Sequence, residues 1–128
     1  MQTTASQRLL SMSLPADASV AERGDAVQLH VRRSELEVVV TVPKNVREWF
    51  VEATDPTTGA RTEDWYDYDG YDSTAPERLD QDMAEEVSLF VERLLGSDLR
   101  FEVSDRAKLL WKLSGTWQQA VPLDASAV

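Results

Sequence analysis

The stretch from Ser73 to Gly96 places the strongest constraint on how this chain folds. Its large apolar residues recur at steps of three and four: Leu79, Met83, Val87, Phe90, Val91 and Leu94. At about 100° per residue, these positions fall within an arc of roughly 120°, which makes one apolar helix face. The spacing predicts an amphipathic helix of about 20 residues, roughly 30 Å long, which can cover one face of a small domain.

Both ends of this predicted helix carry sequence signals. Thr74 stands three residues before Glu77, which is the spacing of a capping box. Pro76 suits the first turn, because the N–H that proline lacks would have no helical partner there. Gly96 follows the last apolar residue and can adopt the left-handed conformation that ends many helices. We therefore predict a helix over about residues 75–95.

Apolar and polar residues alternate with a period of two on both sides of the helix, which indicates half-buried strands. The expected strands cover residues 26–32, 36–42, 47–54, 61–68, 99–103, 109–113 and 117–121. Residues 105–113 also fit a helical face, so both interpretations of that segment stay open. The turn from Asp55 to Gly59 predicts an antiparallel pairing of the strands that flank it. The fold class predicted for the domain, residues 1–128, is α+β, with a mostly antiparallel β-meander sheet and the long helix packed on one face.

The first 25 residues give a weaker pattern, which fits either helical or loose structure. Thr4 and Gln7 have capping-box spacing ahead of several apolar residues, so a short helix is expected there. Asp17 is a candidate cap for a second helical turn over residues 18–23. We expect residues 123–128 to form a frayed tail.

Composition limits the chemistry that is open to the chain. It has no Cys and one His, which excludes disulfides, thiolate metal sites and Cys nucleophiles. No apolar run approaches the roughly 20 residues that span a bilayer, and the N-terminus lacks the early basic region of a signal peptide. We expect a cytoplasmic protein without a cofactor. The preference for Arg over Lys is typical of a GC-rich bacterial genome.

The net charge of −10 is confined to one part of the chain. Residues 51–96 hold 13 acidic and 3 basic residues, whereas acids and bases balance in residues 1–50 and in residues 97–128. This charge disfavours nucleic acid as a partner, since phosphates need a positive surface. It fits a solubilising face, which is the simpler interpretation, or a surface for a basic protein partner.

Residues 64–72 are the most unusual stretch, because carboxylates alternate there with aromatic rings around a glycine. A calcium loop is one interpretation, since closely spaced carboxylates suit a hard cation. The spacing fails, because placing Gly70 at the sixth loop position puts Trp65 at the first and Pro76 at the twelfth, where acids are needed. We therefore predict no metal site at these carboxylates.

The same stretch suits a recognition surface, because Tyr and Trp supply stiff contact area and carboxylates supply steering. Alternation predicts that Trp65 and Tyr66 point to opposite faces, and that Tyr68, Tyr71 or both are accessible. The simpler interpretation is a strand whose rings enter the core while its acids face water. The candidate partner-binding residues are Trp65, Tyr66, Asp67, Tyr68, Asp69, Tyr71 and Asp72.

Other polar residues give weaker signals, and none is assigned a catalytic role. His30 alternates with the apolar face of its strand, and no Gly-x-Ser-x-Gly elbow surrounds any Ser. The pair at residues 32–33 suits an anion or, as we favour, a solvated hairpin end. Asp80 falls inside the apolar arc of the helix and Glu86 borders it, so both are expected to be structural. Leu89 lies on the far side of the helix, where it is either exposed or covered by another segment.

Two classes of function fit these features. The first is a non-enzymatic protein-interaction domain, such as an inhibitor, an immunity-type protein or an adaptor, that docks through the acidic aromatic segment. The alternative is a small-molecule-binding domain or enzyme with a pocket between sheet and helix. The first is favoured because the sequence lacks a recognisable set of catalytic residues.

Overall fold

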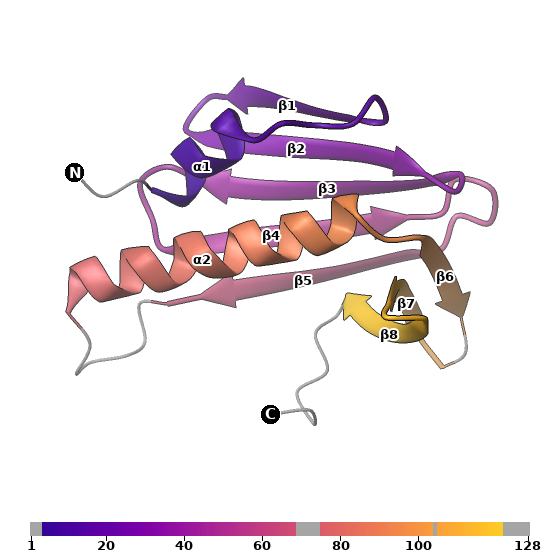
Figure 1. The fold of residues 1–128 in the computed structure, drawn as a ribbon. Coiled ribbons are helices and arrows are strands. Elements are labelled where there is room, and N and C mark those ends of the chain that lie inside the picture. Colours follow the sequence, from indigo (N-terminus) through magenta and orange to yellow (C-terminus); the bar gives the residue numbers. More distant parts are fainter. Residues whose placement is uncertain (1–3, 69–74, 104, 122–128) are drawn as a thin grey trace.

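The computed structural model describes residues 4–68, 75–103 and 105–121 of the 128-residue chain. Within these residues the elements are α1 (Ala5–Ser11), β1 (Ala18–Arg23), β2 (Ala26–Arg33), β3 (Leu36–Pro43), β4 (Glu48–Thr54), β5 (Arg61–Asp67), α2 (Pro76–Leu95), β6 (Leu99–Val103), β7 (Ala107–Leu113) and β8 (Thr116–Val121). Strands β1 to β5 form one antiparallel sheet in chain order, and β6 to β8 form a second (Figure 1). The predicted α+β class is confirmed, with the strands divided between two sheets.

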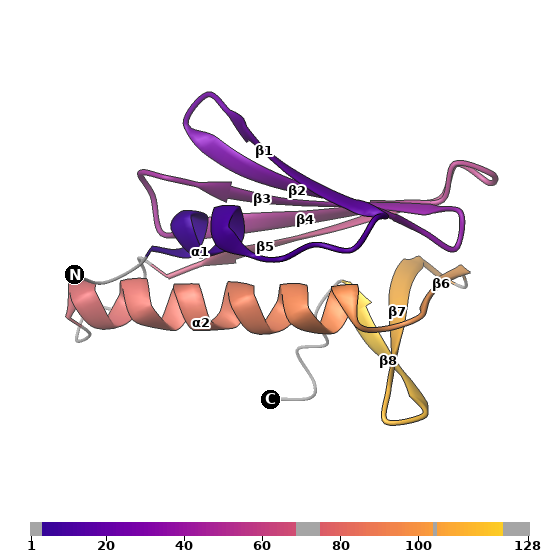
Figure 2. The ribbon, with the colours of Figure 1, turned by 45° about the horizontal axis from the view of Figure 1, so that its top comes forward.

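The helices and the smaller sheet all lie on one side of the five-stranded sheet. Figure 2 shows α2 and the sheet of β6 to β8 below the larger sheet, with nothing drawn above it, and α1 contacts both α2 and β2. Contacts between α1 and α2, and between β5 and β7, close the covered side. The opposite side, which we call the outer face, is covered by none of the described elements.

The core follows the predicted periodicity. The buried residues of α2 include all six members of the predicted apolar arc: Leu79, Met83, Val87, Phe90, Val91 and Leu94. On the sheet, every second residue of β3 is buried, from Leu36 to Val42. Burying one such side chain stabilises the fold by roughly 1.5–3 kcal/mol, so this seam dominates stability. Leu89 is 47% exposed, on the solvent side of the helix.

A chain of aromatic rings joins the layers of the core. The Trp49 ring stacks on Tyr66 with 4.3 Å between centroids and meets the edge of Phe90 at 5.3 Å. The Phe90 ring in turn lies 5.1 Å from Trp111 of the smaller sheet. Such pairs contribute about 0.5–1.5 kcal/mol each beyond burial, so Phe90 couples the helix to both sheets.

The ends of α2 differ from their sequence prediction. The helix has Ala75 as its N-cap without a side-chain cap, and Thr74 lies outside the described residues. Gly96 has φ −95°, so the expected left-handed cap is wrong. A Cβ at Gly96 would lie 3.2 Å from the Glu92 carbonyl oxygen, which accepts the Gly96 N–H at 3.0 Å. Glycine fits this position because space is tight there.

Arg33 closes the C-terminal end of α2, which corrects the prediction of a solvated hairpin end. Its Nη1 donates to three carbonyl oxygens at 2.7–3.0 Å: those of Leu94, Leu95 and Ser97. Its Nε and Nη2 donate to both carboxylate oxygens of Asp17, at 2.8 and 3.0 Å. The hydrogen bond from Arg33 lowers the pKa of Asp17 below its usual value. A cation here satisfies carbonyls that the helix leaves open.

The N-terminal segment contains one confirmed helix and one wrong expectation. Thr4 and Gln7 form the predicted capping box ahead of α1. The segment predicted as a second helical turn, residues 18–23, is instead β1, which pairs with β2 along its whole length. Gly24 has φ +59° and serves the hairpin turn. One isolated helical turn is costly to nucleate, so this segment instead forms a strand that pairs with the edge of the sheet.

Candidate protein-binding surface

The structure separates the residues that the sequence proposed for binding. Trp65 is 53% exposed on the outer face, whereas Tyr66 lies on the covered side against Trp49, which confirms that the two point to opposite faces. Asp67 is exposed at the end of β5. Three of the candidates lie outside the described residues: Asp69, Tyr71 and Asp72.

Tyr68 is buried, so it is not an accessible member of the pair Tyr68 and Tyr71, and Tyr71 lies outside the described residues. Only 7% of Tyr68 is exposed, and its hydroxyl accepts a hydrogen bond from Trp49 Nε1 at 3.0 Å. The same hydroxyl donates to the Glu86 carboxylate. Burial and this carboxylate raise the pKa of Tyr68, so the hydroxyl keeps the proton that it donates. Glu86 therefore fixes Tyr68 against α2, which is a structural role.

The outward residues of β4 and β5 bring acids and aromatic rings together. They form four cross-strand pairs, which we name the β4–β5 face: Glu48–Asp67, Phe50–Trp65, Glu52–Glu63 and Thr54–Arg61. Four of these eight residues are acidic and one is basic. The sequence candidates contributed only Trp65 and Asp67 to this face. The alternation within residues 48–54 and 61–67 indicates the others, once the hairpin register is known.

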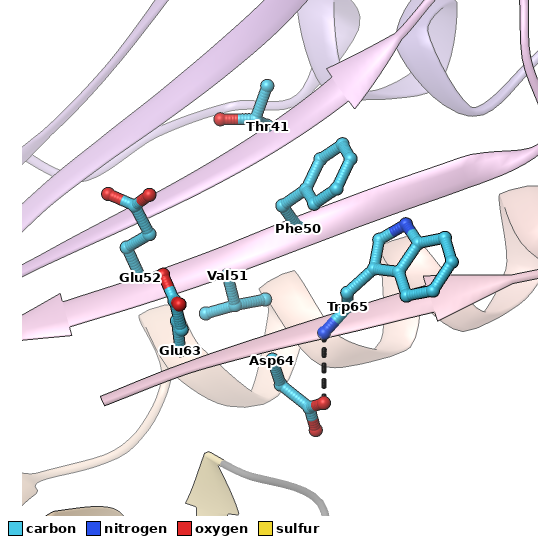
Figure 3. Close-up of a pocket in the computed structure, with 7 residues that line it drawn as sticks. All are labelled: Thr41, Phe50, Val51, Glu52, Glu63, Asp64 and Trp65. Carbon is cyan, nitrogen blue, oxygen red and sulfur yellow. Dashed lines mark hydrogen bonds between the residues drawn. The ribbon is translucent and has the colours of Figure 1, made fainter.

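An aromatic pair stands at the centre of this face. The Phe50 and Trp65 rings are nearly parallel, with 14° between planes and 6.4 Å between centroids. Trp65 Nε1 donates to Glu48 Oε2 at 3.3 Å, which helps to orient the indole. Beside the rings lies an open hollow of about 570 Å³ (Figure 3), lined by Thr41, Phe50, Val51, Glu52, Glu63, Asp64 and Trp65.

Two carboxylates form the other side of the hollow. Glu52 and Glu63 lie directly opposite each other, an arrangement that is destabilising for like charges. Arg61 Nη2 lies 3.3 Å from Oε1 of Glu52 and 3.3 Å from Oε2 of Glu63. These side chains are more than half exposed, so each ion pair contributes little to stability. The face thus combines the exposed Trp65 ring and the partly exposed Phe50 ring with two acids that share one cation, Arg61.

Two other polar residues considered in the sequence, Asp80 and His30, form no catalytic arrangement with other described side chains. Arg47 Nε donates to Asp80 Oδ1 at 2.7 Å, which accounts for the carboxylate inside the apolar arc. His30 lies on the outer side of β2, and its buried Nε2 has no hydrogen-bond partner among the described residues. No group of three acidic or histidine side chains in the described ranges converges as a set of metal ligands.

Two adjoining hollows lie beside α1 and α2, and the larger, of about 270 Å³, is lined by residues that include Thr4, Val46 and Asp80. The smaller hollow, bounded by Thr4 on one side and Met83 of α2 on the other, has a volume of about 40 Å³, little more than a water molecule needs. In the part of the chain that is described, no helix has the length and apolar character required to cross a membrane.

Comparisons with protein-family models, with curated proteins and with solved structures found no match for this chain. The β4–β5 face is therefore the feature of the molecule from which its function is inferred.

Proposed function

We propose that this protein is a non-enzymatic interaction domain that docks a basic protein partner on the β4–β5 face. The observation that carries the proposal is the exposed Trp65 indole, paired with Phe50 beside acidic side chains on a sheet face that no described element covers. Tryptophan is enriched among residues that dominate binding energy, because a stiff ring buries much area at low entropic cost.

The charge of the face supports a basic partner. Its acids outnumber its bases by four to one, and three of them, Glu52, Glu63 and Asp67, belong to residues 51–96, which carry the whole −10 of the chain. Such a surface accelerates association with a cationic partner and disfavours acidic competitors. The same field disfavours nucleic acid, as the sequence already indicated.

The shape of the molecule also favours docking over catalysis. The hollow on the β4–β5 face is open and has a volume of about 570 Å³, whereas the two adjoining hollows beside α1 and α2 have volumes of about 40 and 270 Å³. Small-molecule sites enclose most of their ligand and are typically several hundred Å³ in volume. A shallow acidic surface with an aromatic centre suits an extended protein segment better.

The test is a capture experiment that uses matched variants of the whole chain. Wild type, Trp65→Ala and Leu89→Ala are immobilised and exposed to an extract of the source organism at low salt. Leu89 is a suitable control because it is 47% exposed on the far side of α2. Captured proteins are identified by mass spectrometry, purified, and their affinities measured with each variant.

We expect a basic protein that binds wild type and Leu89→Ala equally and binds Trp65→Ala at least about tenfold more weakly. Affinity should fall as salt rises, because the Debye length shrinks from about 30 Å at 0.01 M to about 8 Å at 0.15 M. Equal affinity of all three variants for every captured protein would contradict the proposal.

A further inference from the structure

The pair formed by Glu52 and Glu63 already holds a guanidinium group. Arg61 uses a single nitrogen, Nη2, to reach one oxygen of each carboxylate at 3.3 Å. Within the described part of the chain, the second oxygen of each carboxylate has no hydrogen-bond donor. Each carboxylate accepts several hydrogen bonds when ionised, so acceptor capacity remains beside Arg61.

The aromatic pair lies next to these acids in a fixed geometry. Phe50 and Glu52 are separated by two positions on β4, and Glu63 and Trp65 by two on β5, which is about 7 Å along each strand. That distance is close to the length of an arginine side chain. A cation placed at the carboxylates can therefore lay its methylene groups or its planar head against the rings.

From this geometry we infer that the partner anchors itself on the β4–β5 face through an arginine side chain. Arginine fits better than lysine for two reasons. Its planar fork can meet two carboxylates at once, and its flat, weakly hydrated head stacks on aromatic rings. The second sheet contains such a contact, where Arg100 Cζ lies 4.7 Å from the Trp117 ring centroid. The inference rests on the proposed docking function and specifies the chemistry of its partner.

The experiment uses defined peptides and the full chain. Short glycine–serine peptides that carry a central arginine, lysine or citrulline are titrated into the labelled protein, and the indole N–H signals are followed by NMR. Citrulline keeps the shape of arginine without its charge. The Trp65 signal is assigned from the Trp65→Phe variant, and the Trp117 signal serves as an internal control. Glu52→Gln/Glu63→Gln removes the acids, and Glu85→Gln/Glu92→Gln removes equal charge from the exposed side of α2.

We expect the arginine peptide to shift the Trp65 signal at lower concentrations than the lysine peptide does, and the citrulline peptide to leave it unchanged. The Glu52/Glu63 double variant should bind the arginine peptide roughly tenfold more weakly, with the Glu85/Glu92 variant close to wild type. Equal binding of arginine and lysine, or equal binding by the two double variants, would overturn the inference.

These outcomes are distinguishable from failure of the docking function itself. If a basic protein is captured through Trp65 while the arginine peptide leaves the Trp65 signal unchanged, docking stands and the arginine anchor is wrong. If the peptide behaves as expected and no protein depends on Trp65, the face binds arginine and the docking function is wrong.

Discussion

Two aromatic pairs occupy neighbouring positions on the same two strands, one on each side of the sheet. On the covered side, Trp49 and Tyr66 stack 4.3 Å apart, and Trp49 is only 3% exposed. On the outer side, Phe50 and Trp65 are 6.4 Å apart, and Trp65 is 53% exposed. Burial accounts for the first pair. The second should contribute less to folding, and the proposed function assigns it to binding.

The largest expected effect lies on the covered side. Phe90 touches both Trp49 and Trp111, so Phe90→Ala should lower the free energy of unfolding by about 3–5 kcal/mol, measured by urea denaturation. That is a large share of the roughly 5–15 kcal/mol of a typical domain. Leu89→Ala, one residue away and facing solvent, should change it by no more than about 0.5 kcal/mol. Similar losses of unfolding free energy in the two variants would contradict the distinction between the buried and the exposed side of α2.

Neighbouring arginines provide a second contrast of the same kind. The Arg33 side chain is 18% exposed and donates hydrogen bonds to carbonyl oxygens at the end of α2, whereas the Arg32 side chain is 79% exposed and pairs with Glu37. Arg33→Met should cost about 1.5–3 kcal/mol of unfolding free energy, since it removes charged hydrogen bonds. Arg32→Met should cost at most about 0.5 kcal/mol. If Arg33→Met unfolds at the same urea concentration as wild type, the capping role is wrong.

Asp17 should make part of this stability depend on pH. Its pKa is lower in the folded state than its usual value of about 3.9. The carboxylate therefore stabilises the fold above the unfolded pKa, and this contribution is lost as pH falls below about 4. The free energy of unfolding of Asp17→Asn should fall less than that of wild type between about pH 6 and pH 3. Parallel curves for the two proteins would show that the ion pair has no such effect.

The smallest effect on stability should come from the outer pair. Trp65→Ala removes the ring contact with Phe50 and an exposed hydrogen bond to Glu48, so it should change the free energy of unfolding by at most about 1 kcal/mol. Melting curves of this variant and wild type test the expectation. A loss as large as that of Phe90→Ala would mean that the outer ring is part of the core, and the argument for binding would lose its basis.

Local periodicity predicted most of the secondary structure, because the helix and strand patterns depend only on residues close together in the sequence. The apolar arc of α2 and the alternation of β2 to β5 needed no distant information. The Arg33 contact with α2 joins residues 61 to 64 positions apart, and no local pattern reports it. The split into two sheets is equally non-local.

The candidate site was predicted only in part for a related reason. Alternation along a strand predicted that Trp65 and Tyr66 lie on opposite faces, and the structure shows that Trp65 is the exposed one. Its cross-strand neighbours on the face come from β4 and depend on the register of the hairpin. Tyr68 can be buried because its hydroxyl has two hydrogen-bond partners: it accepts from Trp49 and donates to Glu86. A sequence pattern contains the alternation but not these partners.

Side-chain footprinting of the complex tests the central claim most directly. Hydroxyl radicals oxidise exposed tryptophans, and Trp65 and Trp117 report on different sheets of one molecule. With the captured partner bound, the account predicts that Trp65 oxidises several-fold more slowly while the rate at Trp117 stays unchanged. An unchanged rate at Trp65 in the saturated complex would contradict the claim that the β4–β5 face is the binding surface.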